Sequence, residues 1–281
     1  MILSRRCAVD GRAAWATATL GGRRISALLS HAWKLLDEVK HAHDTQLDPP
    51  PAKGSLLQFA GETSLERWQV ATDTDVGGLS DCRLVAHTAS SALWQGRTCL
   101  EVDEERQRLQ KNDQGHEASR TGFCAIRTPF DASALSLNDF HGLCIRMRPD
   151  ERHYVLNLRA ATILSDARTE DLYQASLHQF LPFALPVEDT HQEGATTPML
   201  DVRIPWGAFT LTWRGYVQGA RPPAMNLDRI THLGFLLADT REGEFACELH
   251  EVSAFRYDEH ELVHDAHARE ALRLNEERGY R

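Results

Sequence analysis

The sequence predicts an all-β fold, an antiparallel jelly-roll β-sandwich with helical N- and C-terminal extensions. From Gly54 to about Tyr257, apolar and polar side chains alternate with a period of two, as in half-buried strands. Turn-rich segments join these runs, and the helical patterns that connect parallel strands are missing between them. With 281 residues, 42% of them hydrophobic, the chain can bury a substantial core.

Changes in composition along the chain predict three segments. Residues 1–53 form a basic, targeting-like arm with an amphipathic helix and a proline-rich linker, residues 54–257 form the β-sandwich domain, and residues 258–281 form a charged helical tail. The first 30 residues contain five arginines and one aspartate, a composition that resembles a mitochondrial or chloroplast targeting segment. An ordinary basic arm would have the same composition.

Charge and hydropathy limit the classes of partner. The net charge of -9 argues against nucleic acid, because no basic face would neutralise phosphates. No apolar run approaches the roughly 20 residues that a membrane-spanning helix requires. We therefore expect a protein that is soluble or peripheral to a membrane.

The six cysteines are scattered and include no C-x-x-C pair. Cys82, Cys124, Cys144 and Cys247 lie in strand-like apolar surroundings, where a free thiol behaves as a small buried hydrophobic group. This usage suits a reducing compartment. The even count also permits a disulfide framework, although the chain lacks the short length and dense spacing typical of one.

Residues 25–43 predict an amphipathic helix with one apolar stripe, because apolar residues recur at spacings of three and four. The stripe contains Ile25, Leu28, Leu29, Ala32, Trp33, Leu36 and Val39. Three prolines, at 49 to 51, then end any helix and begin a stiff linker. The stripe either packs back on the domain or docks on another protein.

The stretch Trp68–Ser80 predicts a strand, a tight turn and a second strand, most simply a structural hairpin. Gly77 and Gly78 tolerate positive φ and close backbone approach, and the Asp and Thr residues before them can hydrogen-bond local amides. Asp73 and Asp75 would lie on the same side of an extended strand. They could form a catalytic carboxylate pair, but a turn-forming role is simpler.

A second hairpin is predicted from residues 143–148 and 153–158, with residues 149–152 as its turn. Further strands are expected at residues 79–86, 122–128, 173–183, 199–204, 230–237 and 245–255. Near Leu249–Val252 the alternation slips by one residue, which predicts a β-bulge. Residues 101–119 are interpreted as a charged surface insertion and residues 188–198 as an exposed loop.

Three histidines near the C-terminus are candidate metal ligands. His260, His264 and His267 would share one face of a continuous helix and could bind a metal. A solvated helix explains that segment better, because residues 258–281 hold seven acidic and four basic side chains. There is no G-x-S-x-G elbow, no P-loop and no G-x-G-x-x-G that opens a helix.

Tryptophans raise the alternative of a carbohydrate-binding jelly-roll module, because sugars stack on aromatic rings. Trp94 and Trp206 fall at strand positions where core packing is expected. Trp213 lies near a loop with Tyr216 and is the better candidate for an exposed contact with a glycan or a protein.

Six motifs resemble, in order, those of the complex I intermediate-associated protein 30 family, over about residues 55 to 257. The first is the signature formed by Trp68, Asp73, Asp75, Gly77, Gly78 and Ser80. The others are residues 93–96, residues 122–127, residues 140–154, residues 204–209 and residues 243–255. The resemblance implies a galactose-binding-like jelly roll and a role in assembling respiratory NADH:ubiquinone oxidoreductase, by binding membrane-arm intermediates.

The resemblance also implies no catalytic site, no cofactor, protein subunits of complex I as partners, and a place in the mitochondrial matrix, peripheral to the inner membrane. Partner-binding candidates are Leu28, Leu29, Trp33, Leu36, Trp213 and Tyr216. The sequence departs from the family at the 101–119 insertion, at Met199 and Leu200, where a tryptophan is common, and in its terminal helices. The protein could act as a transient assembly factor or as a permanent accessory subunit, and the sequence is compatible with both roles.

Overall fold

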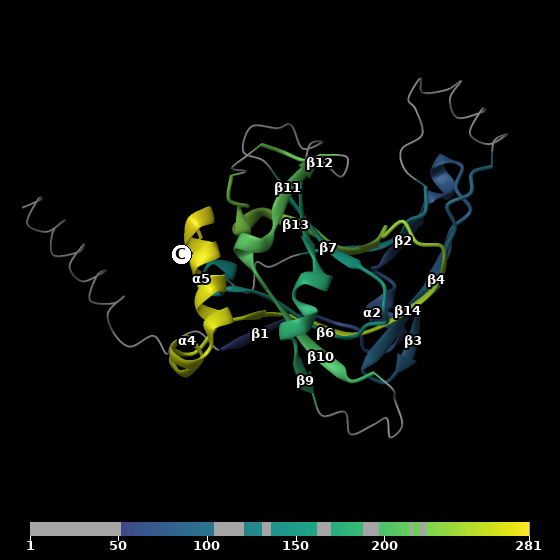
Figure 1. The fold of residues 1–281 in the computed structure, drawn as a ribbon. Helices are drawn as coiled ribbons and strands as arrows, with labels where there is room; N and C mark the ends of the chain where they lie inside the picture. Colours follow the sequence, from purple (N-terminus) through teal and green to yellow (C-terminus); the bar gives the residue numbers. More distant parts are fainter. Residues whose placement is uncertain are drawn as a thin grey trace, which may run out of the picture. The chain divides into compact units, whose positions relative to one another are not determined.

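Two antiparallel sheets of seven strands each face one another across an apolar core (Figure 1). This computed structural model describes residues 52–103, 121–130, 136–161, 170–187, 197–213, 216–219 and 223–280, and the strand counts refer to them. All of them belong to one unit, residues 51–281. The predicted antiparallel β-sandwich with a helical C-terminal extension is confirmed, and the helix predicted at residues 25–43 lies outside the described residues.

Sheet A is organised around β14, a 13-residue strand. Its order is β3 (Asp81–Thr88), β4 (Ser91–Thr98), β14 (Gly243–Phe255), β6 (Gly142–Arg148), β10 (Met199–Pro205) and β9 (Leu185–Val187). The seventh strand, β1 (Lys53–Gln58), pairs with the second half of β14, on the edge whose first half pairs with β4. Between Leu249 and Glu251 the register with β6 shifts, so the predicted bulge is confirmed.

Sheet B has β7 and β13 near its centre. Its order is β12 (Tyr216–Val217), β11 (Thr210–Trp213), β8 (Glu170–Ser176), β7 (Tyr154–Ala161), β13 (Ile230–Leu237), β5 (Cys124–Pro129) and β2 (Gln69–Thr72). The predicted strand at residues 173–183 is wrong in its second half, because β8 ends at Ser176 and two 3-10 turns follow. Pro182 lies in the second turn and has no amide to donate to a sheet.

Both predicted hairpins are wrong in their pairing. The strands on either side of the Asp73 turn are β2, in sheet B, and β3, in sheet A. Likewise β6 belongs to sheet A and β7 to sheet B. Alternation identifies the buried face of a strand but not the sheet that it joins, and each short link crosses between the two sheets instead of turning within one.

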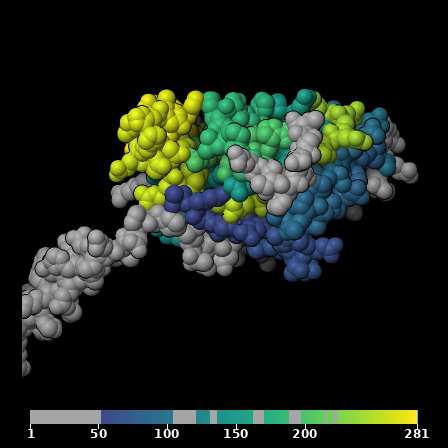
Figure 2. Space-filling model, turned by 90° about the horizontal axis from the view of Figure 1, so that it is seen from below, coloured from purple at the N-terminus to yellow at the C-terminus, as the bar shows by residue number. Residues whose placement is uncertain are grey.

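Helices are short and lie mostly after the last strand. They are α2 (Gly61–Leu65), α4 (Glu259–His264) and α5 (Ala266–Arg278). Six 3-10 turns complete the elements in the described ranges: η1 (Asp73–Val76), η2 (Leu137–Asp139), η3 (Leu177–Gln179), η4 (Leu181–Phe183), η5 (Trp206–Ala208) and η6 (Leu227–Arg229). In Figure 2 the yellow C-terminal helices cover one end of the sandwich, and β3 and β4, in blue, lie at the other.

Candidate interaction surfaces

The signature turn is a buried hydrogen-bond centre built on Asp73. Its carboxylate accepts from the amide of Ser80 at 2.9 Å, the hydroxyl of Ser80 at 2.8 Å and the amide of Gly122 at 2.5 Å. The amide of Phe123 lies 3.4 Å away. Asp73 is fully buried, so these donors replace the water that an ionised carboxylate would otherwise require. The turn thereby joins the start of β3 to the start of β5.

Two features of this turn explain its sequence. Gly77 has a φ of 83°, which favours glycine, and a Cβ on Gly78 would lie 2.1 Å from the Asp73 carboxyl carbon. The expectation that Asp73 and Asp75 lie on one side is wrong, because η1 is a 3-10 turn in which Asp73 is buried and Asp75 is exposed. Trp68 packs in the core, with its ring 4.8 Å from that of Phe59. We therefore assign the signature a structural role.

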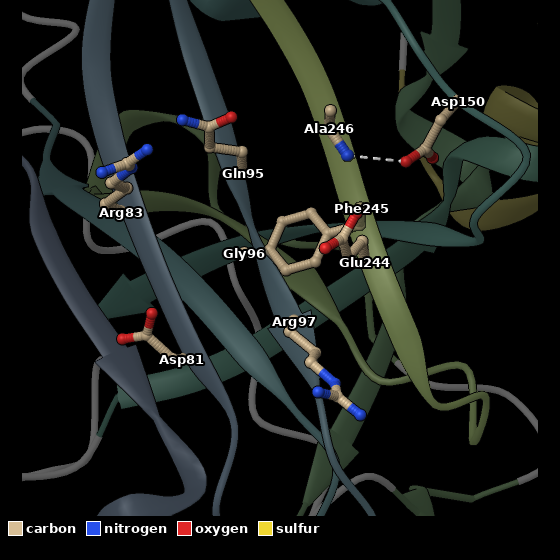
Figure 3. A pocket seen from close by; sticks show the side chains of 9 residues that line it. All are labelled: Asp81, Arg83, Gln95, Gly96, Arg97, Asp150, Glu244, Phe245 and Ala246. Carbon is tan, nitrogen blue, oxygen red and sulfur yellow. Dashed lines mark hydrogen bonds between the residues drawn. The ribbon is translucent and has the colours of Figure 1, made fainter.

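A polar groove of about 660 Å³ lies on the outer face of sheet A, across β3, β4 and β14 (Figure 3). Strand pairing sets its side chains in two rows, Asp81 with Arg97 and Glu244, and Arg83 with Gln95 and Ala246. With its amide oxygen turned toward Arg83, Gln95 accepts two hydrogen bonds from the guanidinium, at 3.0 and 3.1 Å. Among the described lining residues the one aromatic ring, Phe245, is buried.

Asp150 closes one side of this groove and holds it to the rest of the sandwich. One carboxylate oxygen accepts from the amide of Arg152 and the hydroxyl of Tyr154, both at 2.9 Å. The other accepts from the amide of Ala246 at 2.7 Å (Figure 3). The groove is therefore a firmly held surface of mixed charge, suited to polar contacts with a partner. Sequence reasoning missed it, because the outward rows become visible only once the strands are paired.

The edge of sheet B carries a second candidate surface. Trp213 pairs with Tyr216, and Thr212 with Val217, in the hairpin of β11 and β12. Trp213, Tyr216 and Val217 are 61%, 62% and 63% exposed, and we call these three side chains the apolar tip. The expected exposure of Trp213 is confirmed. Its role in contacting a partner stays a prediction.

The apolar tip stands on a well-fixed strand. The hydroxyl of Thr212 donates to the side-chain oxygen of Gln174 at 2.8 Å, with the carbonyl of Leu172 at 3.3 Å. Gln174 in turn donates to Asn157 at 2.9 Å. These contacts connect β11 to β8 and β7. A recognition surface on such a scaffold loses little conformational freedom when it binds.

Trp94 and Trp206 are fully buried, which confirms their expected place in the core. Trp94 packs against Phe245, with ring centroids 5.2 Å apart. The indole of Trp206 donates to the carbonyl of Phe140 at 2.7 Å. Neither ring is placed to stack on a sugar.

The prediction of one continuous C-terminal helix is wrong, because α4 ends at His264 and Asp265 caps a second helix, α5. The Asp265 carboxylate accepts from the amide of His267 at 2.8 Å. The rings of His260 and His264 lie 4.5 Å apart, while that of His267 lies 3.8 Å from Phe183. In the described part of the chain, no group of three or more His, Cys, Asp or Glu side chains is arranged to hold a metal.

The second C-terminal helix packs on the sandwich through one buried face. Asn275 accepts from the amide of Gly207 at 2.7 Å and donates to the carbonyl of His141 at 2.8 Å. A Cβ on Gly207 would lie 2.4 Å from a helix carbonyl, so glycine permits this close approach. Beyond the helix, the hydroxyl of Tyr280 accepts from the amide of Met225 at 2.7 Å. The outer face of the helix alone is left for a partner.

Four of the predicted partner-binding residues lie outside the described residues: Leu28, Leu29, Trp33 and Leu36. The charged insertion falls mostly outside them as well. Within the described ranges, no helix has the length and apolar character needed to cross a membrane.

The fold places this protein among antiparallel jelly-roll β-sandwiches. It is similar to a family 11 carbohydrate-binding module from Clostridium thermocellum, with 12% identity, a TM-score of 0.44, and coverage of 73% of this chain and 95% of the module. A family 30 carbohydrate-binding module has 10% identity, a TM-score of 0.40, and coverage of 75% and 91%. These similarities concern the fold alone.

The chain belongs to the complex I intermediate-associated protein 30 family, whose model matches residues 57–249. It is 24% identical over 241 residues to the mouse (Mus musculus) protein "Complex I intermediate-associated protein 30, mitochondrial". That match covers 81% of this chain and 65% of the mouse protein, just under two thirds of its length. The family resemblance read from the six motifs is confirmed.

Proposed function

We propose that this protein is a non-catalytic scaffold that acts in the assembly of mitochondrial complex I by binding intermediates of its membrane arm. Membership of the complex I intermediate-associated protein 30 family is the observation that carries this proposal. The name of the mouse relative supports a mitochondrial site of action. The place of action is the matrix, at the surface of the inner membrane.

The apolar tip is the surface that we assign to partner binding. Trp213 and Tyr216 offer large apolar areas with polar atoms at their rims, and side chains of this kind carry most of the binding energy in protein interfaces. Because both rings are exposed in the free protein, covering them would remove apolar area from water. Burial against a hydrophobic subunit would shield that subunit until its next partner arrives.

The groove on sheet A is suited to a different contribution. Arg83, Arg97, Asp81 and Glu244 present both signs of charge on one firm surface. Charges of this kind at an interface rim favour the correct partner and disfavour others more than they add affinity. The groove would therefore set orientation, and the apolar tip would supply most of the affinity.

Complexome profiling on native gels tests the proposal. A tagged chain is expressed in cells that lack their own copy, and its migration is compared with that of Trp213→Ala, Tyr216→Ala and a matched control, Val70→Ala. Val70 is exposed on β2, the opposite edge strand of the same sheet. Each tip variant should weaken binding by roughly 30-fold, the equivalent of about 2 kcal/mol for an aromatic hot spot. The control should migrate as the wild type does.

The same profile separates the two roles that a complex I partner can have. Migration with subassemblies alone identifies an assembly factor, and migration with the mature enzyme identifies an accessory subunit. Recovery only as a free monomer would contradict both. Carbonate extraction and protease protection of intact mitochondria test the peripheral matrix location.

Carbohydrate binding is the second candidate, and the exposure of the Trp213 ring is the observation that favours it. An exposed indole can stack on a sugar ring. A glycan-array signal that disappears in Trp213→Ala would support this function. An array without signal, together with co-migration in the profile, would leave the scaffold function standing.

A further inference from the structure

Two buried cysteines meet across the core, one from each sheet. Cys82 lies on β3 of sheet A, and Cys124 is the first residue of β5 in sheet B. The Cys124 sulfur lies 3.6 Å from the carbonyl oxygen of Asp81, the residue before Cys82, so the two side chains are neighbours in the core. Cys82 is 8% exposed and Cys124 is fully buried. Nothing in the scaffold function described above uses this pair.

The indole of Trp94 supplies a second, independent feature of the same site. Trp94 is fully buried, and its Nε1 has no hydrogen-bond partner among the described residues. Leaving a buried N–H without an acceptor is costly, and native proteins rarely do so. The Cys82 thiol neighbours this indole, which lowers the pKa of the thiol. An N–H donor at a sulfur stabilises the thiolate more than the thiol.

The two thiols differ in acidity because of these contacts. The pKa of Cys82 is lowered, first by the hydrogen bond from Cys124 and also by Trp94, although burial opposes both. The same contact with Cys82, together with burial, raises the pKa of Cys124. Cys82 is also the more exposed thiol of the two. Cys144, in contrast, has its pKa raised to about 12 by burial.

We propose that Cys82 and Cys124 form a reversible disulfide that joins the two sheets when the protein meets a hydroperoxide. The Cys82 thiolate attacks the terminal oxygen of the hydroperoxide, its O–O bond breaks, and the released alkoxide takes a proton to leave as an alcohol, or as water from hydrogen peroxide. Cys124 sulfur then attacks the resulting Cys82 sulfenic acid, and hydroxide leaves with the Cys124 proton as water. Two thiols are oxidised and one peroxide is reduced.

The disulfide would have two consequences for the molecule. It closes a loop from residue 82 to residue 124 and fastens β3, an edge strand, to the opposite sheet, which restricts the unfolded chain. Cys82 also lies between Asp81 and Arg83, two of the groove residues. Oxidation at Cys82 therefore fixes the strand that carries one wall of the groove.

Peptide mapping of the full chain tests the proposal. The protein is treated with hydrogen peroxide, its remaining thiols are alkylated, and it is digested with trypsin without reduction. Cleavage after arginine yields residues 68–83 and 121–127, each with a single cysteine. We expect these two peptides to be joined by a disulfide and to separate on reduction. We also expect the melting temperature of the oxidised protein to be roughly 5 to 10 °C higher than that of the reduced protein.

Variants separate this assignment from general thiol oxidation. Cys124→Ala should lose the cross-link and leave Cys82 as a sulfenic acid that dimedone traps, whereas Cys247→Ala, which removes another buried thiol, should cross-link normally. Trp94→Phe should slow the oxidation of Cys82 severalfold, because the N–H donor is gone. A folded wild-type protein in which both peptides stay alkylated, or in which Cys82 proceeds to a sulfonic acid without cross-linking, would overturn the proposal even if a variant failed to fold.

Discussion

Arg152 and Asp239 form a bidentate, buried ion pair. It joins the link between β6 and β7 to the link between β13 and β14. Nε and Nη2 of Arg152 each lie 2.8 Å from a carboxylate oxygen of Asp239, and the two side chains are 6% and 1% exposed. Arg152 also donates to the Thr98 hydroxyl at 2.8 Å and the Gly243 carbonyl at 3.2 Å. The pair holds Asp150, two residues before Arg152, against the groove.

Asp239→Asn should destabilise the protein strongly, because it leaves the Arg152 guanidinium buried without its counter-charge. Breaking such a pair costs about 3 to 5 kcal/mol, or roughly 10 °C in melting temperature for a domain of this size. Glu270→Gln breaks an exposed ion pair with Arg273 and is the matched control. Equal melting temperatures for Asp239→Asn and the control in calorimetry would contradict the structural role of the pair.

Asp73→Asn and Asp75→Asn should differ sharply in stability. The Asp73 carboxylate accepts several hydrogen bonds, and an asparagine there turns an NH2 group toward donors, at a cost of about 2 to 4 kcal/mol. Asp75 is exposed, so its change should cost less than about 0.5 kcal/mol. Urea unfolding of both variants measures the difference. Similar midpoints would restore the view of the two aspartates as an equivalent pair.

His141 should make the protein less stable as the pH falls below about 6.5. Burial, and then the nearby charge of Arg256, lowers the pKa of His141, and its Nδ1 accepts from the amide of Tyr257 at 3.0 Å. In the unfolded chain this histidine has a pKa of about 6.5, so below that pH the unfolded state binds a proton that the folded state does not bind. The free energy of unfolding therefore decreases as the pH falls, until the pKa of the folded state is reached. Melting temperatures at pH 7.5 and 5.5 should differ less in His141→Gln than in the wild type. An unchanged difference would exclude this contribution.

Asn275→Ala should destabilise the sandwich itself, because it removes the partners of the Gly207 amide and the His141 carbonyl. Leaving these buried groups unpaired costs about 1 to 3 kcal/mol. Glu276→Ala, at an exposed neighbouring position on the same helix, is the control. If thermal unfolding of the two variants coincides, the helix is a detachable docking arm, as its charge alone suggested.

The strand pattern could be predicted because it depends on burial, which residue type reports directly. Ile230–Leu237 and the slip near Leu249 appear in the structure as β13 and the bulge of β14. The exposure of Trp213 was likewise predictable from its place near a loop. The break at Asp265 was not, because its N-cap role depends on the direction in which the chain leaves α4.

The sequence by itself determined the fold class, the family and most strand positions, because alternation and local turn chemistry act over a few residues. Only the tertiary structure decided which sheet each strand joins, and therefore which distant residues meet. Arg152 was expected in a simple turn, yet its partner Asp239 lies 87 residues away. Cys82 and Cys124 likewise meet only because β3 and β5 belong to opposite sheets. Either sheet buries one face of a strand equally well, so the choice depends on how all fourteen strands of the described chain pack together.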